Sequence, residues 1–89
     1  MNQEDNGKNF YDVVDKFIDL ANEISRSDYS VKVGVALRFA AARYSAYEAS
    51  LMTNNLVEDK DKLIQVFAND YTKMLQANFD NYIEIQSRK

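Results

Sequence analysis

The sequence predicts an all-α protein, a three-helix bundle with a long C-terminal helix. The chain of 89 residues has no proline and two glycines, whereas an all-β domain of this size needs many tight turns built from both. Its 46% hydrophobic and 12% aromatic content is typical of an ordered chain. Apolar residues recur at helical spacing in three segments. A chain this short has room for one core, so we expect a polar tail over residues 1–8 and one helical domain over residues 9–89.

The first helix is expected from Phe10 to Ser25. Asn9 is a candidate N-cap, and Asp12 has the spacing of a capping-box acid. One side of the helix is apolar and is formed by Phe10, Val13, Val14, Phe17, Leu20, Ala21 and Ile24. The opposite side is acidic and is formed by Asp12, Asp15, Asp19 and Glu23. Carboxylates on one helix face point apart, so we expect a solvated surface and no metal site.

The second helix is expected to follow a cap at Asp28 or Ser30 and to end near Met52. It is apolar on two opposite sides. The bulkier side is formed by Val33, Leu37, Ala40, Tyr44, Tyr47 and Leu51. The other, the alanine-rich side, is formed by Val35, Phe39, Ala42, Ala46 and Ala49. Arg38 and Arg43 lie between the two sides. A helix that is apolar on opposite sides must be covered on both.

The alanine-rich side predicts self-association. Small side chains let a neighbouring helix approach closely, and symmetric dimers are the commonest oligomers. We therefore expect a homodimer formed through Val35, Phe39, Ala42, Ala46 and Ala49. One alternative is a monomer in which the first and third helices cover both sides of the second. Another is a different protein partner on the open side.

The third helix is expected from Leu56 to Ile85. Asn55 and Glu58 have capping-box spacing, and acidic residues suit the positive end of the helix dipole. The apolar stripe of this helix is formed by Leu56, Leu63, Ile64, Phe67, Tyr71, Met74, Leu75, Tyr82 and Ile85. Asn78 lies at the centre of the stripe. A buried asparagine there would fix the register or the oligomeric state, or would orient a ligand.

Five side chains are candidate binding residues: Arg38, Arg43, Tyr44, Tyr71 and Asn78. The planar arginine forks suit a carboxylate or phosphate. The alternative for the arginines is pairing with acids of the first and third helices. The tyrosines are expected in the core, with a small polar pocket as the alternative.

Composition argues against several classes of function. The net charge is −3 and the eleven Lys and Arg residues are scattered, which is unlike a nucleic-acid binder. Without His or Cys, and with no carboxylate singled out as a general base, we expect neither catalysis nor a cofactor. No apolar run approaches the ~18 residues of a membrane span, and the acidic N-terminus does not resemble a secretory signal. We expect a cytoplasmic protein that does not bind membranes.

Three segments carry a family resemblance: FIDLANEI (Phe17–Ile24), VALRFAAARYSAY (Val35–Tyr47) and DYTKMLQANFDNYIE (Asp70–Glu84). Together they resemble a family of small bacterial proteins catalogued as domain of unknown function 3144. The resemblance implies a small, free-standing, cytoplasmic, all-helical protein. The family has no established activity, so no functional residue carries over. We expect a non-catalytic interaction or regulatory module acting through helix–helix contacts. The alternative is a small-molecule or anion binder with a Tyr/Arg/Asn-lined pocket between the second and third helices.

Overall fold

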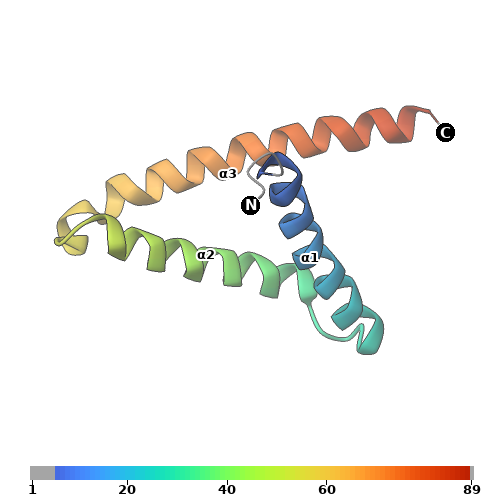
Figure 1. Ribbon diagram of the computed structural model, residues 1–89, viewed down its shortest axis with the longest axis horizontal. Coiled ribbons are helices and arrows are strands. Elements are labelled where there is room, and N and C mark those ends of the chain that lie inside the picture. The colour runs from blue at the N-terminus through green and yellow to red at the C-terminus, as the bar shows by residue number, and fades with distance from the viewer. Residues whose placement is uncertain (1–5, 89) are drawn as a thin grey trace. The chain divides into compact units, whose positions relative to one another are not determined.

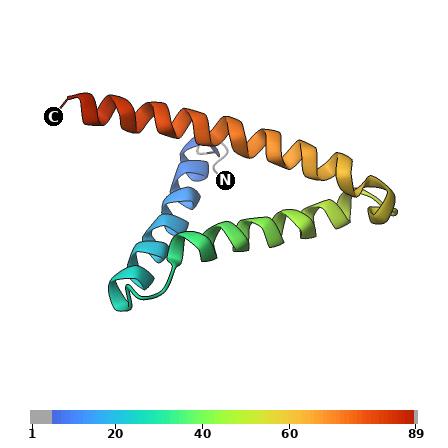
Figure 2. The ribbon, with the colours of Figure 1, turned by 180° about the vertical axis from the view of Figure 1, so that it is seen from behind.

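The computed structural model describes residues 6–88, which form three α-helices in the order shown in Figure 1. They are α1 (Asn6–Ser27), α2 (Val33–Met52) and α3 (Leu56–Ser87). The view from behind in Figure 2 shows each as an uninterrupted helix. The helices have 22, 20 and 32 residues, so the predictions of an all-α fold, three helices and a long C-terminal helix are confirmed.

Helix α1 is longer than predicted at both ends. It begins at Asn6 instead of Phe10 and ends at Ser27 instead of Ser25. The N-cap prediction is wrong, because Asn9 lies inside the helix and a cap residue must lie at its end. No proline interrupts the residues before Phe10, so the helical hydrogen bonds continue through this polar stretch. Of the predicted tail over residues 1–8, residues 1–5 lie outside the described residues.

The turn between α1 and α2 is closed by Asp28. Its Oδ1 atom accepts hydrogen bonds from the Ser30 backbone N–H, at 3.1 Å, and from the Ser30 hydroxyl. The same two bonds, the hydroxyl one first, lower the pKa of the Asp28 carboxyl from its usual value. The prediction that Asp28 or Ser30 caps the second helix is wrong, because α2 begins only at Val33. These side chains instead bind each other in an Asx turn.

The backbone groups into two units, one ending at Arg43 and the next beginning at Tyr44. The first contains α1 and the first half of α2, with Ala21, Ser25 and Val33 half-buried. The second contains the rest of α2 and all of α3. Among the described residues, Ala49 alone is buried, at 5% exposure. Most of the apolar surface of these helices is therefore exposed, and the hydrophobic effect favours covering it by contact.

Helix α3 begins with the cap that the sequence predicts. Asn55 is its N-cap, and the side-chain oxygen of Asn55 accepts a hydrogen bond from the Glu58 N–H at 3.3 Å. The Asn55 amide donates back to the Glu58 carboxylate at 2.8 Å. Thr53 Oγ1 accepts from the Asn55 N–H at 2.9 Å and donates to the Asp59 carboxylate at 2.6 Å. These bonds fix the start of α3 against the end of α2.

The second unit shows where α2 and α3 face each other. On α2 and in the turn directly after it, the least exposed side chains recur every four residues: Ser45, Ala49 and Thr53. On α3 they also recur every four residues: Asp59, Leu63 and Phe67. Side chains four residues apart lie on one line along a helix, so we infer that these two lines meet. The small residues on α2 let α3 approach closely near the turn.

Candidate functional site

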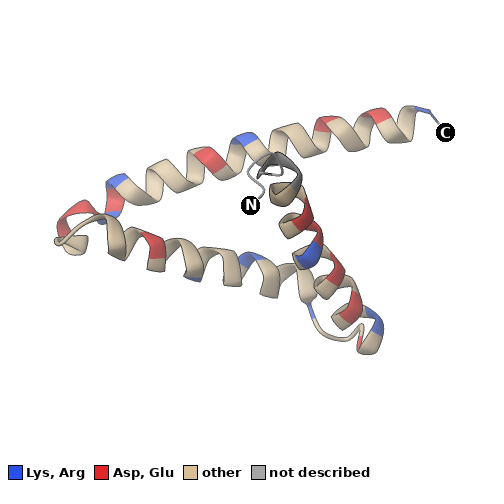
Figure 3. Ribbon diagram, in the orientation of Figure 1, with Lys and Arg blue, Asp and Glu red and all other residues tan. Residues whose placement is uncertain are grey.

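The candidate functional site is a set of exposed apolar helix surfaces. On α2, Phe39 is 69% exposed, while Tyr44 and Leu51, on the opposite side of the helix, are 62% and 70% exposed. Figure 3 shows α2 with few charged residues, in contrast to α1 with its row of acidic residues. The two apolar sides that the sequence predicts for α2 are thus both accessible in the structure.

The alanine-rich side of α2 is open except at one end. Val35 is 55% exposed, and Phe39, Ala42 and Ala46 are also exposed. Ala49 is the exception, because it lies on the line where α2 faces α3. The chain itself therefore covers the C-terminal end of this side. The remaining four residues form a continuous open surface.

The two arginines of α2 are exposed. The Arg38 guanidinium folds back along its own helix, with its NH1 atom 3.6 Å from the place where a Cβ on Gly34 would lie. Within the described part of the first unit, neither Arg38 nor Arg43 forms an ion pair with an acid of α1. Their guanidinium groups remain accessible to water.

The tyrosines expected in the core are exposed. Tyr44, Tyr47, Tyr71 and Tyr82 are 62%, 54%, 45% and 63% exposed. The rings of Tyr44 and Tyr47 lie with centroids 5.6 Å apart and planes tilted by 52°, which makes one aromatic pair on α2. The structure therefore presents these rings on the surface.

A shallow apolar depression lies on one face of α3. Leu75, Asn78, Phe79 and Tyr82 line it. Of the five predicted binding residues, it contains Asn78 alone. The Asn78 side-chain amide donates a hydrogen bond to the Met74 carbonyl at 2.8 Å, so one of its polar groups is satisfied within the helix.

The apolar stripe predicted for the third helix omits Phe79, which is 62% exposed and lines the depression. Its spacing was the available signal. Phe79 lies four residues after Leu75 and three before Tyr82, so it belongs to the same apolar face.

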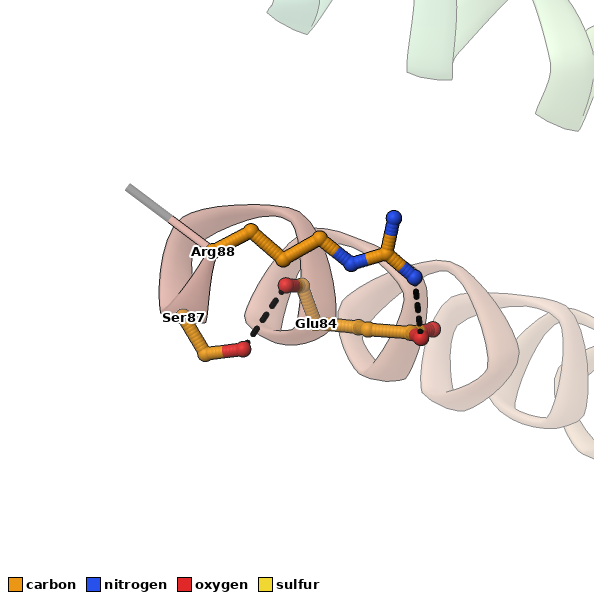
Figure 4. A network of polar contacts seen from close by, with 3 residues as sticks. All are labelled: Glu84, Ser87 and Arg88. Atoms are coloured by element: carbon orange, nitrogen blue, oxygen red, sulfur yellow. Dashed lines mark hydrogen bonds and ion pairs between the residues drawn. The ribbon is translucent and has the colours of Figure 1, made fainter.

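The C-terminal end of α3 has polar contacts of its own (Figure 4). Arg88 NH2 lies 2.8 Å from Glu84 Oε2, and Ser87 Oγ donates to the Glu84 carbonyl at 2.8 Å. Both charged side chains are more than 60% exposed, so the pair contributes little free energy.

Two features are absent from the described residues, a cluster of metal-ligating side chains and a membrane-spanning helix. Nowhere in residues 6–88 do three His, Cys, Asp or Glu side chains gather as metal ligands would. None of the three helices described is long and apolar enough to cross a membrane.

The fold and its exposed faces place the chain among small all-α proteins that expose apolar helix surfaces. The chain belongs to the family described as "Protein of unknown function (DUF3144)", whose model matches residues 10–83. The resemblance seen in the sequence is thereby confirmed. No curated protein and no solved structure matches the chain.

Proposed function

We propose that the chain is a non-catalytic interaction module that acts through helix–helix contacts and self-associates as a homodimer. The observation that carries the proposal is the exposure of apolar side chains on both sides of α2. Keeping apolar surface in contact with water costs ~25 cal/mol of free energy per Å² compared with burying it. A second copy of the chain, which carries the same surface, is always present at the chain's own concentration.

The alanine-rich side is the proposed dimer surface. Phe39 is its natural anchor, because an aromatic side chain carries ~150–250 Å² and Phe39 is 69% exposed. Covering it would contribute about 3 kcal/mol. Ala42 and Ala46 follow Phe39 by one and two turns on the same side, and their small side chains let the partner helix approach closely. Val35 extends the apolar surface by one turn.

The alternative function, a small-molecule or anion binder, has less support. Its pocket would combine an arginine with Tyr44, Tyr71 and Asn78. The depression at Asn78 contains none of the others, and its remaining lining residues are Leu75, Phe79 and Tyr82. The cytoplasmic location and bacterial origin expected from the sequence are part of the main proposal.

The experiment that tests the proposal is light scattering after gel filtration over a hundredfold concentration range. We expect twice the monomer mass of 10.3 kDa for the wild type and a lower mass for Phe39→Glu. Ala41→Glu is the matched control, because it places the same charge on the side of α2 that carries Glu48, two turns away, and not on the alanine-rich side. A wild-type mass of 10.3 kDa at every concentration overturns the homodimer.

A further inference from the structure

We propose that residues 75–82 of α3 form a second self-complementary surface, at which two copies of the chain pair with their α3 helices antiparallel. The inference rests on the proposed function in one respect, namely that open apolar helix faces of this chain are contact surfaces. It names a different face, and either surface can hold while the other fails. If both pair, two isologous contacts per chain give a mass above that of a dimer, and both Phe39→Glu and Phe79→Glu lower it.

The length of α3 leaves this face without cover from α2. Helix α3 has 32 residues and α2 has 20, so α3 is longer by 12 residues. At 1.5 Å per residue the difference is about 18 Å. Even a fully closed hairpin, starting at the cap on Asn55, would bring α2 only as far as about Leu75. The apolar face beyond that point lies outside the reach of α2.

The depression has the symmetry of a two-fold contact. Its four lining residues are placed symmetrically about the midpoint between Asn78 and Phe79. A two-fold axis through this midpoint, perpendicular to α3, would place Leu75 of one copy against Tyr82 of the other. It would also place Asn78 against Phe79. This i, i+3, i+4, i+7 spacing, which an apolar helix face has in general, permits an isologous pairing of two copies.

The chemistry of the face suits a second copy in this orientation. The charged residues Lys73, Asp80 and Glu84 fall on the opposite side of α3, so two copies can approach without burying a charge. Antiparallel helices also align their dipoles favourably. Asn78 donates one amide hydrogen to Met74 and keeps a carbonyl oxygen and a second N–H. These polar atoms, lying beside the axis, would fix the register.

The available area predicts a weak pairing. Phe79 and Tyr82 are 62% and 63% exposed, which corresponds to about 90–160 Å² for each aromatic side chain. With Leu75, and with Tyr71 and Ile85 on either side, the face offers about 500 Å² per copy. Two copies would bury about 1,000 Å², the lower limit for a specific interface. The pairing should therefore depend on concentration.

The test uses opposite charges at the axis. Phe79→Glu and Phe79→Lys each bring two like charges together across the two-fold, and we expect either change to weaken association at least tenfold. Mixing the two variants in equal amounts should restore the mass, because unlike charges then meet. Ala77→Glu and Ala77→Lys are matched controls on the opposite side of α3 and should leave the mass unchanged.

The outcomes separate this inference from the α2 dimer. If Phe79→Glu lowers the mass and Phe39→Glu does not, the α3 surface is supported and the α2 dimer is overturned. The reverse result overturns the α3 surface. A loss of helicity without any change in mass would show that Phe79 is covered within its own chain, which also overturns the inference. A mixture that stays dissociated rules out the two-fold register.

Disulfide trapping tests the orientation, because the chain has no cysteine of its own. A mixture of Leu75→Cys and Tyr82→Cys chains should form a disulfide between the two variants under mild oxidation. Leu75→Cys alone should link poorly. In the antiparallel register, position 75 of one copy faces position 82 of the other, so the two cysteines lie seven residues apart along the helices. Efficient linking of Leu75→Cys to itself would indicate parallel helices and overturn the proposed pairing.

Discussion

Replacing Gly34 with alanine should stabilise the protein. Gly34 lies in the first turn of α2, and no described glycine has a positive φ, so the backbone at this position suits alanine. A Cβ built on Gly34 would meet the Arg38 NH1 atom at 3.6 Å, an ordinary van der Waals contact with the end of a flexible side chain. The substitution therefore removes the conformational entropy of an unfolded glycine without introducing strain.

The expected gain follows from helix propensity. Gly→Ala at a compatible position stabilises a protein by about 0.4–1 kcal/mol. For a domain of this size, that corresponds to a melting temperature higher by about 2–8 °C. The lower part of the range is the better expectation, because Gly34 lies close to the helix end, where fewer hydrogen bonds depend on its conformation.

Thermal and urea unfolding followed by circular dichroism at 222 nm would measure the effect at one fixed protein concentration, since association shifts the apparent stability. Ala36→Gly, two residues further along the same helix and also exposed, is the control. It should lower the stability by about 0.5–1 kcal/mol.

One result would refute the reasoning. If Gly34→Ala lowers the melting temperature while Ala36→Gly behaves as expected, another backbone must approach Gly34 more closely than the structure shows. A concentration-dependent loss would place that backbone in a second copy of the chain.

Three further predictions follow from the polar contacts. Asn55→Ala should destabilise the protein by about 1 kcal/mol in urea unfolding, because it leaves the first turn of α3 uncapped. The Asp28 carboxyl should titrate below 3.8 by carbon-detected NMR, and Ser30→Ala should raise its pKa again. Because its folded pKa is lowered, the contribution of Asp28 to stability is present above pH 3.8 and is lost as the pH falls through the folded pKa. Arg88→Gln should change the stability by less than about 0.5 kcal/mol, and high salt should remove the difference, because the pair with Glu84 is exposed.

Each of these predictions has a contradicting outcome. Asn54→Ala, next to the cap, should be nearly neutral, and a loss equal to that of Asn55→Ala would assign the effect to the turn in general. An Asp28 carboxyl that titrates at its usual value would show that its bonds to Ser30 do not persist in solution. A larger loss for Arg88→Gln would mean that the end of α3 contributes to a contact beyond the pair with Glu84.

Sequence reasoning succeeded where the interactions are local. The cap at Asn55 was predictable because the Glu58 N–H and carboxylate lie three residues away, within reach of one side chain. The caps proposed at Asn9 and at Asp28 or Ser30 were wrong for a related reason. Residues with capping side chains also occur inside helices and in turns, and only the backbone path distinguishes these positions.

The candidate surfaces were predictable in part. Helical periodicity placed Phe39 and Ala42 on one side of α2, and the structure leaves both exposed. It also placed Tyr71 and Tyr82 on the apolar stripe of α3. Periodicity identifies the side of a helix that a residue occupies, but burial depends on which neighbour lies against that side. The tyrosines lie on the apolar side and were therefore expected in a core, but no neighbour among the described residues covers them and they are exposed.

The sequence by itself determined the all-α class, the three helices and the start of α3, because helical hydrogen bonds and caps join residues at most four positions apart. Only the tertiary structure decided that α3 faces α2 along the line of Ser45 and Ala49, and that Tyr71 and Tyr82 are exposed. These features depend on contacts between residues far apart in the chain and on the unequal lengths of the helices. Helical periodicity within one segment carries no information about such contacts.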